Sequence, residues 1–387
     1  MRLLHTSDWH LGRRLHGEDL LAHQAHFLDW LVELAQAEQV GAVLVSGDVY
    51  DRAQPGADAV RLMDRTLAAF VRAGIALVIS SGNHDSAVRL QYAGDVLSAT
   101  GIHLRTELGQ VLDPVLLSDD AGPVGVYAIP FLLPDAVTTE LAVERSHAEV
   151  LGHLARRIRE DAAQRGLERV VVMAHAFVTG GSATESEREI RVGGVGDTPA
   201  SVFDGLTYVA LGHLHRPQRI SLAGSATRLS YSGSPLAFSF SEREHVTSVS
   251  IVDIDALGGV SVRRVPTPVP RPLVQVSGRL DELLARAEGD LARLAQAWVK
   301  VVLTDPGRVP NPMDRLRQVW PHTLVLEFAP ERDGAPSAGP RRYTEASDPV
   351  QICADFVAEV SGAQASEVQR ELLAQAVHAA TTAEAVS

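Results

Sequence analysis

Short apolar runs alternate with amphipathic stretches through the first half of the chain. Residues 42–46 (AVLVS) and 75–80 (IALVIS) are almost continuously apolar, which is typical of buried strands, and residues 2–5 begin another strand. The stretches between them, 20–38 and 57–73, carry apolar side chains at three- and four-residue steps, as one face of a helix requires. This βαβαβ order predicts an α/β fold with a layered core.

The same alternation continues beyond residue 100 and then changes. Between residues 227 and 265 three strand-like runs follow one another without a helix, which predicts antiparallel strands that complete the α/β core. The other predicted elements are a helix at 87–98, strands near 102–105 and 124–129, a long helix at about 139–165, and strands at 169–174 and 207–211.

A proline-rich segment, PTPVPRP at 266–272, should be stiff and extended and therefore predicts a domain boundary. The order strand, helix, strand, helix, strand over 273–330 predicts a compact α+β unit, and a polar Gly/Pro-rich linker follows at 331–342. Two amphipathic helices are predicted next, at 348–360 and 365–380, the first with Ile352, Phe356, Val357 and Val360 on one face. We therefore predict an α/β domain at 1–268, a small α+β capping domain at 269–335 and a helical tail at 345–387.

Charge and composition limit the function classes. A chain of 387 residues is long enough for two or three units, and 45% hydrophobic residues suffice for packed cores. The formal net charge is -13, which is unlike a free-standing DNA binder with a basic stripe. Bound divalent cations or a partner subunit would supply positive charge. An acidic protein with a small-molecule substrate remains an open alternative.

Cysteine content and hydropathy bear on location. Cys353 is the single cysteine, so no disulfide can form within the chain, which fits a reducing compartment. The first residues, MRLLHTSDWHLG, lack the apolar region of a signal peptide, and no run of about 18 apolar residues exists to span a membrane. We expect a cytoplasmic protein without a membrane partner.

Polar clusters follow five of the predicted strands. In an α/β sheet ligands bind beyond the carboxyl ends of the strands, so five such clusters should converge on one place. Residues two apart in an extended segment project to the same side, which lets an Asp-x-His or His-x-His pair reach one ion. The glycines at 47, 82 and 212 permit tight turns and close approach of the backbone. The candidate metal ligands are Asp8, His10, Asp48, Asn83, His175, His213 and His215.

Each cluster alone has an ordinary structural explanation. Asn83 could cap the next helix, His175 could be a hydrogen-bonded core histidine, and the Gly-Asp-x-x-Asp run at 47–51 could be turn chemistry. The ordered set at five strand ends favours one metal site instead. Carboxylate, imidazole and amide oxygen together suit Mn, Fe or Zn better than Ca, which prefers oxygen ligands alone.

The order of these clusters, DxH, GDxxD, GNHD, H and GHxH, resembles that of the calcineurin-like metallophosphoesterases, which implies a layered metallophosphoesterase-type sandwich for the first domain. The flanking sequences are similar to the SbcD family of bacterial nuclease subunits. The resemblance extends from residue 1 to about 265 at the level of motifs, and over 266–387 only in layout. The flanks are HTSDWHLGR at 5–13, SGDVYDRAQP at 46–55, SGNHDS at 81–86, YVALGHLHRPQ at 208–218 and YSGSPLAFSFSE at 231–242.

The resemblance implies a role for each matching residue. His84 would be a catalytic histidine that faces the phosphate without binding metal, and Asp85 would orient it. Asp51 stands where the archaeal and eukaryotic branch usually has a histidine, and it could serve the turn or the chemistry. One ion would bind Asp8, His10, Asp48 and His215, and the other would bind Asp48, Asn83, His175 and His213.

The resemblance also implies a function and partners. It implies two divalent ions per subunit, most often Mn²⁺, and cleavage of DNA: exonuclease action on duplexes and endonuclease action on single strands or hairpins, in repair, recombination and replication. The partner would be the ATPase SbcC, bound through the tail in a heterotetramer that associates with the nucleoid, and the tail helices could instead pack on the capping domain. A homodimer would form through the helices at 57–73 and 87–98, where Leu62, Leu67, Phe70, Leu90 and Leu97 could serve either the dimer or packing on the sheet.

Three further interpretations stay open. The loop at 179–197 (TGGSATESEREIRVGGVGD) is too long for a bare connection, and Arg188 and Arg191 in it could contact phosphate or pair with neighbouring glutamates. The same metal site would also suit a phosphoesterase of small nucleotides. A catalytically silent scaffold protein is a third possibility, although the complete ligand set argues against it.

Overall fold

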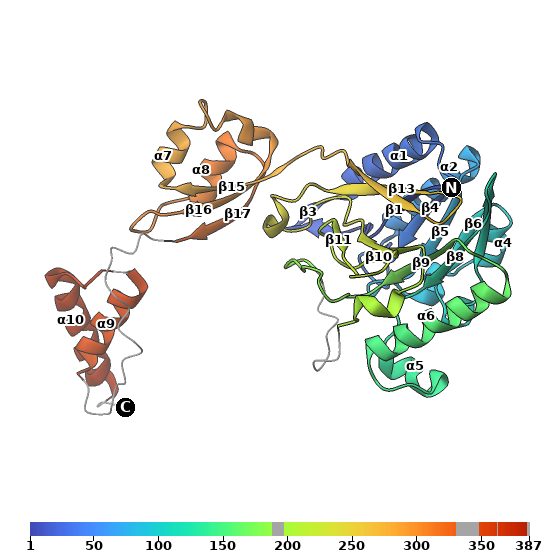
Figure 1. The fold of residues 1–387 in the computed structure, drawn as a ribbon. Coiled ribbons are helices and arrows are strands. Elements are labelled where there is room, and N and C mark those ends of the chain that lie inside the picture. The colour runs from blue at the N-terminus through green and yellow to red at the C-terminus, as the bar shows by residue number, and fades with distance from the viewer. Residues whose placement is uncertain (188–196, 330–347, 362, 385–387) are drawn as a thin grey trace. The chain divides into compact units, whose positions relative to one another are not determined.

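The computed structural model describes residues 1–187, 197–329, 348–361 and 363–384. The chain divides into two compact units, Met1–Pro270 and Arg271–Ser387 (Figure 1). The boundary falls within the proline-rich segment at 266–272. No helix among the described residues is long and apolar enough to cross a membrane.

Two six-stranded sheets form the centre of the larger unit (Figure 1). The first has the order β14-β13-β1-β4-β5-β6, in which the four strands from β1 to β6 are parallel and β13 and β14 complete the sheet antiparallel to their neighbours. Its strands are β1 (Arg2–Thr6), β4 (Ala42–Ser46), β5 (Ala76–Ser80), β6 (Ile102–Arg105), β13 (Ser248–Ile254) and β14 (Val260–Pro266).

The second sheet has the order β11-β12-β10-β9-β8-β7, in which β12, β10, β9 and β8 are parallel. The edge strands β11 and β7 are antiparallel to their neighbours and are too short or too polar to be predicted from apolar runs. Of the three strands predicted as antiparallel after residue 227, the first, β12, is antiparallel to β11 but parallel to β10. The strands are β7 (Val115–Asp119), β8 (Gly122–Ile129), β9 (Val170–His175), β10 (Tyr208–Gly212), β11 (Gln218–Ile220) and β12 (Arg228–Tyr231), and a small hairpin pairs β2 (Arg14–Leu15) with β3 (Glu18–Asp19).

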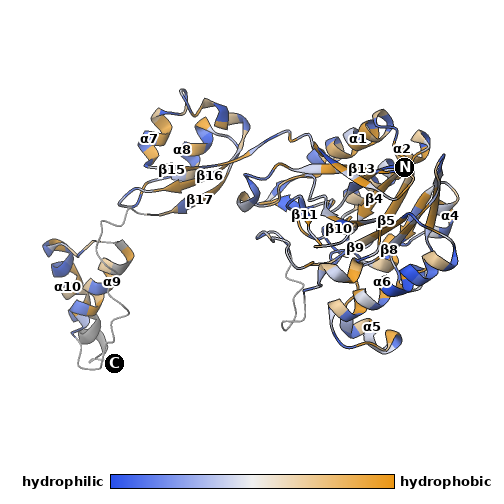
Figure 2. Cartoon of the chain, in the orientation of Figure 1, coloured by the Kyte–Doolittle hydropathy of each residue, from blue (hydrophilic) through white to orange (hydrophobic). Residues whose placement is uncertain are grey.

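Helices cover the outer faces of both sheets, which makes the larger unit a four-layer α/β/β/α sandwich. Alternate residues of β4 show why: Val43 and Val45 pack under the helices, whereas Ala42 and Leu44 pack between the sheets. The strands are therefore apolar on both faces, and Figure 2 shows them largely in the hydrophobic colour. The first sheet is covered by α1 (Leu21–Ala37) and α2 (Ala57–Ala73), with α3 (Ala87–Leu90) and α4 (Gly94–Ser98) near its edge, and the second by α5 (Pro134–Leu141) and α6 (His147–Gln164).

Two of the predicted helices are wrong in their extent. The single helix at about 139–165 is two helices, because Ala142 adopts a left-handed conformation (φ 53°) that ends α5. The hydroxyl of Ser146 then accepts a hydrogen bond from the amide of Glu149 and caps α6. The helix at 87–98 is likewise interrupted, since Ala93 has φ 60°.

The smaller unit contains a three-stranded parallel sheet. The predicted order of strands and helices over 273–330 is confirmed, and a 3-10 turn, Ala292–Gln296, follows the first of the helices. Fully buried Leu316 and Trp320 lie in its core. The elements are β15 (Leu273–Gly278), α7 (Leu280–Ala285), β16 (Trp298–Leu303), α8 (Pro312–Val319) and β17 (Thr323–Phe328).

The tail contains the two predicted helices, α9 (Pro349–Ser361) and α10 (Glu367–Glu384). The predicted linker at 331–342 lies outside the described residues. Figure 1 shows the tail helices as a pair.

Candidate metal centre

The seven predicted ligands lie together at one end of the sandwich, beyond the carboxyl ends of five parallel strands. Strands β1, β4 and β5 of the first sheet and β9 and β10 of the second all end there. Three overlapping groups of ligand atoms lie within 4.8 Å of one another, and every residue in them is buried. The groups are Asp8, His10 and His215; His10, Asp48 and His84; and Asp8, Asp48 and His175.

Asp48 lies at the middle of the cluster. Its Oδ2 is 3.4 Å from Nε2 of His175, 3.7 Å from Nε2 of His10 and 3.9 Å from Nε2 of His84. Its Oδ1 accepts a hydrogen bond of 2.9 Å from the backbone amide of His84. A carboxylate that faces imidazoles from both sheets is placed to be shared between two ligand groups.

The remaining ligand atoms also converge on common points. The side-chain oxygen of Asn83 lies 2.9 Å from Nε2 of His175 and 3.3 Å from Nδ1 of His213. On the other side of Asp48, Nε2 of His10 lies 3.1 Å from Nε2 of His215. Imidazole nitrogens directed at the same point, with an amide or carboxylate oxygen beside them, form the mixed set of ligand atoms that a borderline divalent cation prefers.

Four of these residues have positive φ angles, which are uncommon for residues other than glycine. Asp8, His10, Asp48 and His213 have φ angles of 54°, 45°, 51° and 102°. The loops hold one another in this state, since the amide of Asp8 donates to the carbonyl of Gly47 (3.1 Å) and that of His10 to the carbonyl of Asp48 (3.0 Å). Such strain persists only where the surroundings enforce it and is concentrated at functional sites.

Two of the predicted glycines allow the loops to approach this closely. A Cβ atom at Gly212 would collide with the carbonyl oxygen of Ser46, which links the second sheet to the first. A Cβ at Gly82 would collide with the carboxylate of Asp48. The role predicted for these glycines, close approach of the backbone at the site, is confirmed.

Burial makes the site electrostatically costly without a cation. Burial raises the pKa of Asp8 to about 6, against the opposing charges of His175 and His215. Burial alone would lower the pKa of His175, but the adjacent carboxylate of Asp48 raises it to about 9. Buried carboxylates and imidazoles of this kind are stabilised when a divalent cation supplies the positive charge. The residues present therefore fit a metal centre.

His84 lies beside the cluster, with its ring centroid 4.6 Å from that of His10. Its Nδ1 hydrogen-bonds the backbone carbonyl of Asp51 at 2.8 Å. The family resemblance implies that Asp85 orients this ring, but the hydrogen bonds of the Asp85 carboxylate go to other partners. It accepts hydrogen bonds from the amides of Val49 (3.1 Å), Tyr50 (2.9 Å) and Gly82 (2.9 Å), and so holds two ligand loops together.

Asp51 contacts neighbouring residues through its backbone carbonyl and its carboxylate. Its carbonyl orients His84, and its carboxylate lies 3.7 Å from the guanidinium of Arg13. Arg13 also lies over the ring of Phe238, with 4.8 Å from the guanidinium carbon to the ring centroid. Of the two roles left open for Asp51, support of the local structure is the one with contacts in the structure.

Glu242, a residue that no sequence pattern marks as functional, is buried behind the cluster. Its Oε1 accepts a hydrogen bond of 3.1 Å from Nδ1 of His215, and its Oε2 accepts one of 2.7 Å from the amide of Phe238. Burial would raise the pKa of Glu242, but its bond to His215 lowers it to about 2. A carboxylate bonded to Nδ1 fixes the tautomer that leaves Nε2 free for a metal. The only signal was that Glu242 ends the family-like run at 231–242, and no spacing rule links it to His215.

The described part of the loop at 179–197 contacts the site. The hydroxyl of Ser186 bonds to Nδ1 of His215 (2.6 Å), and its carbonyl accepts from Arg13 (2.8 Å). The carboxylate of Glu187 accepts from the amide of His215 (2.7 Å). Arg188 and Arg191, the predicted phosphate contacts, lie outside the described residues.

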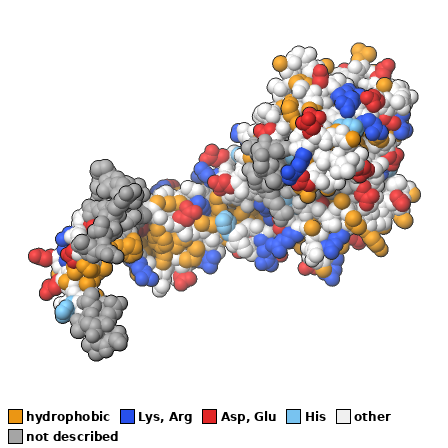
Figure 3. Space-filling model, turned by 90° about the horizontal axis from the view of Figure 1, so that it is seen from below, with side chains coloured by type: hydrophobic (Ala, Val, Ile, Leu, Met, Phe, Trp, Pro, Cys, Tyr) orange, Lys and Arg blue, Asp and Glu red, His pale blue; other side chains and the backbone are white. Residues whose placement is uncertain are grey.

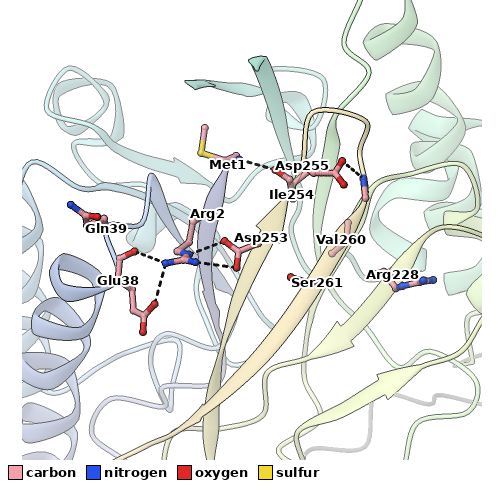
Figure 4. Close-up of a pocket in the computed structure, with 11 residues that line it drawn as sticks. Met1, Arg2, Glu38, Gln39, Arg228, Asp253, Ile254, Asp255, Val260 and Ser261 are labelled. Atoms are coloured by element: carbon pink, nitrogen blue, oxygen red, sulfur yellow. Dashed lines mark hydrogen bonds and ion pairs between the residues drawn. The ribbon is translucent and has the colours of Figure 1, made fainter. Parts of the chain in front are cut away.

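A separate pocket lies at the opposite ends of the strands (Figure 4). It has a volume of about 700 Å³ and is lined by the start of β1 and the turn between β13 and β14. The guanidinium of Arg2 in it is already paired with Asp253 (2.7 Å) and Glu38 (3.3 Å). This pocket contains none of the predicted site residues.

Comparison with known proteins agrees with this geometry. Residues 1–217 match the family model of the calcineurin-like phosphoesterases, and residues 269–361 match a model described as the type 5 capsule protein repressor C-terminal domain. A Rhodobacter capsulatus protein, named as the SbcD component of the nuclease SbcCD, is 38% identical over 355 residues, 86% of this chain and 84% of that one. The chain belongs to the SbcD branch of the calcineurin-like phosphoesterases.

Two other SbcD-branch proteins of the same name align over a similar length. The Bacillus subtilis protein is 35% identical over 342 residues, which is 83% of this chain and 84% of that one. The Staphylococcus saprophyticus protein is 30% identical over 330 residues, which is 84% of each chain. Membership of the family identifies the chain as a metal-dependent hydrolase of phosphoesters.

Proposed function

We propose that this protein is a divalent-metal-dependent DNA nuclease that works with an ATPase of the SbcC type. The observation that carries the proposal is the convergence of Asp8, His10, Asp48, His175 and His215 at the strand ends. The proposal is also supported by the three relatives, each of which is named as the SbcD component of the nuclease SbcCD. The proposed parts are a nuclease domain at 1–268, a capping domain at 269–335 and a partner-binding tail at 345–387.

The proposed metal centre divides the ligands into two sets that share Asp48. Bound divalent ions would supply positive charge to the phosphoryl oxygens and lower the pKa of the attacking water. Mn²⁺ is the proposed ion because the family resemblance implies it, whereas the ligand types alone suit Mn, Fe or Zn. The first set is Asp8, His10, Asp48 and His215, and the second is Asp48, Asn83, His175 and His213.

The residues around this centre would handle the scissile phosphate. His84, fixed by the carbonyl of Asp51, would donate a proton from Nε2 to the leaving 3′ oxygen. Asp85 would hold the loops of Asp48 and Gly82 together through its hydrogen bonds to their backbone amides. Arg188 and Arg191 remain proposed phosphate contacts. The proposed activities are exonuclease cleavage of duplex DNA and endonuclease cleavage of single-stranded or hairpin DNA.

The decisive experiment compares substrates and metals. Purified protein is incubated with labelled duplex, hairpin and single-stranded DNA, and with mononucleotides and cyclic nucleotides, in Mn²⁺, in Mg²⁺ or in EDTA. We expect DNA cleavage with Mn²⁺ that EDTA abolishes. Hydrolysis of nucleotides without cleavage of DNA would favour the alternative, a phosphoesterase of small nucleotides. A lack of hydrolysis of every substrate, with metal bound and SbcC and ATP added, would favour a scaffold protein.

The tail is the proposed binding segment for SbcC. Four of its large apolar side chains are exposed rather than packed: Phe356 (65%), Val360 (65%), Val368 (69%) and Leu372 (60%). In the face drawn in Figure 3, hydrophobic side chains are visible on the surface of the smaller unit. An amphipathic helix pair with an uncovered apolar face suits docking against another helical protein.

A homodimer is proposed through α2, α3 and α4, but through other side chains than the five leucines and phenylalanines named from the sequence. Leu62, Phe70 and Leu90 are buried, and Leu67 and Leu97 pack against the same core. The exposed large apolar side chains are Val60 (45%) and Val71 (39%) on α2, and Val88 (75%), Tyr92 (83%) and Val96 (72%) between residues 87 and 98. We expect Tyr92→Glu to convert a dimer to a monomer in light scattering, whereas a wild-type protein that is already monomeric would contradict the proposal.

A further inference from the structure

Strands β11 and β14 are edge strands, one in each sheet, and neither pairs with a further strand on its outer side. We call the side of the sandwich formed by these two strands the open edge. Arg219 lies in the middle of β11, and the next residue, Ile220, packs in the core under α6. Because successive side chains of a strand point to opposite faces, Arg219 points toward the space between the sheets. Its partner in register, Ser230 of β12, lies on the same face.

Arg264 of β14 faces the same space from the other sheet. It shares its strand face with Val260 and Val262, which pack against the core between the sheets. The residue before it, Arg263, points outward and pairs with Glu38 at 2.8 Å. Two guanidinium groups therefore enter the open edge from opposite sheets.

Positive charge gathers at this edge without a compensating acid. Arg216, two residues before β11 and one after His215, is close enough to act on Arg264 as well. Burial lowers the pKa of Arg264, and the charges of Arg219 and Arg216 lower it further. Among the residues that the structure describes, no ion pair joins any of these three arginines to a carboxylate. Like charges held together in this way repel one another, and an anion between them would relieve the repulsion.

A buried hydroxyl also faces this edge. Ser250 of β13 pairs in register with Arg264 and is fully buried. Its Oγ has no hydrogen-bond partner in the described part of the chain. A buried polar atom without a partner is unfavourable, so a ligand or a water that bonds to it would stabilise the site.

The register gives the distance from this edge to the metal centre. Arg264 pairs with Ser250, which pairs with His5, three residues before Asp8. Three residues along a strand and two strand spacings across the sheet amount to about 14 Å. At roughly 3.4 Å per stacked nucleotide, this corresponds to about four nucleotides of a strand.

We propose that the open edge between β11 and β14 is a phosphate site, in which Arg219 and Arg264 hold the backbone of the DNA strand about four nucleotides from the bond to be cut. The inference rests on the proposed nuclease function and adds a second contact site for the DNA strand, away from the metal centre. Guanidinium groups bind phosphate through paired hydrogen bonds, which suits a backbone contact without base recognition. A local basic edge also explains how a chain with a net charge of -13 can hold DNA.

The test uses the full chain with the substitutions Arg219→Gln and Arg264→Gln together. The matched control is Arg156→Gln with Arg157→Gln, which removes the same charge from the exposed face of α6. We expect the test variant to bind a labelled 12-nucleotide strand in EDTA about tenfold or more weakly than the control, by fluorescence anisotropy. The slope of log K against log salt should fall by about 1.4, since each lost single-strand contact contributes roughly 0.7.

Two further measurements make the result specific. Dinucleotides should be cleaved equally by both variants, because they are too short to reach the edge. Inorganic phosphate should raise the melting temperature of the control but not of the test variant. Equal DNA affinity in the test variant and the control would overturn the proposal. If the test variant also loses association with SbcC while its DNA affinity is unchanged, the two arginines bind an acidic protein partner instead of DNA. Failure of the wild type to cleave both a dinucleotide and DNA would instead refute the proposed nuclease function.

Discussion

His84 differs from the neighbouring imidazoles in what holds its ring. The carbonyl of Asp51 accepts a hydrogen bond from Nδ1 of His84, so Nδ1 carries a proton. In the neutral ring Nε2 then has a free lone pair, and in the charged ring Nε2 is a second donor, which faces Asp48. His84 also shares a group of close ligand atoms with His10 and Asp48. The proposed separation of the roles of metal ligand and proton donor therefore depends on this one residue.

The first prediction concerns this separation. His84→Gln should lower the rate of DNA cleavage by about 100-fold or more, the usual contribution of a general acid, and leave Mn²⁺ affinity nearly unchanged. His10→Gln is the matched control and should lose both. Metal affinity by isothermal titration calorimetry, alongside single-turnover cleavage, measures the difference. If His84→Gln loses metal as His10→Gln does, His84 is a ligand.

The second prediction concerns Glu242, which touches no substrate and acts through His215. Glu242→Ala should weaken Mn²⁺ binding by about 10–100-fold, because His215 loses the acceptor that fixes its tautomer. Glu242→Gln keeps an oxygen for that bond and should recover most of the affinity. Glu244→Ala, in an exposed neighbour, is the control and should bind metal normally. Equal affinity in all three variants would show that Glu242 serves the fold alone.

At the scale of elements, the site depends on how closely strand β10 approaches strand β4. Gly212 ends β10 directly against the carbonyl of Ser46, which also accepts a hydrogen bond from Nδ1 of His175 (2.9 Å). The two sheets thus meet at the ligand loops through backbone atoms, and a single methyl group at this contact would separate them.

Gly212→Ala should therefore lower both stability and metal binding. Overpacking of a close contact costs about 1–3 kcal/mol, and the displaced loop carries His213 and His215. Gly152→Ala within α6 is the control: its Cβ would meet only Val202 at 3.7 Å, and removal of a helical glycine should stabilise by about 0.5–1 kcal/mol. Thermal unfolding with and without Mn²⁺ measures both. A Gly212→Ala protein that unfolds and binds metal like the wild type would contradict the inferred contact.

At the scale of the whole molecule, the residues proposed for hydrolysis and those proposed for partner binding lie in different compact units. The larger unit contains the complete ligand set, whereas the exposed apolar residues of the tail belong to the smaller unit. Hydrolysis and partner binding should then be separable by substitution.

The last prediction tests that separation. Phe356→Glu with Leu372→Glu should abolish co-purification with SbcC, because two charges cannot be buried in an apolar groove. Hydrolysis of a dinucleotide by the isolated protein should not change. Gln364→Glu with Gln375→Glu adds the same charge at exposed polar positions of the tail and is the control. Undiminished association of the test variant, or of a chain that lacks residues 345–387, would refute the role of the tail.

The sequence by itself determined the order of the elements and the identity of the polar clusters. Apolar runs such as 42–46 give strands wherever both faces are covered, and polar residues directly after them must lie at the strand ends. The convergence of Asp8, Asp48 and His175 followed from that rule without any knowledge of contacts. The sequence also predicts a domain boundary at 266–272, because proline restricts the backbone locally.

Only the tertiary structure decided what depends on contacts between distant segments. The helix break at Ala142, the bond from Glu242 to His215 and the engagement of Asp85 with backbone amides follow no local spacing. The placement of Arg219 near Arg264 at the open edge likewise arises from two sheets that are separate in sequence. Hydrophobic periodicity specifies which face of an element is buried, but it does not specify which polar group the fold places opposite it.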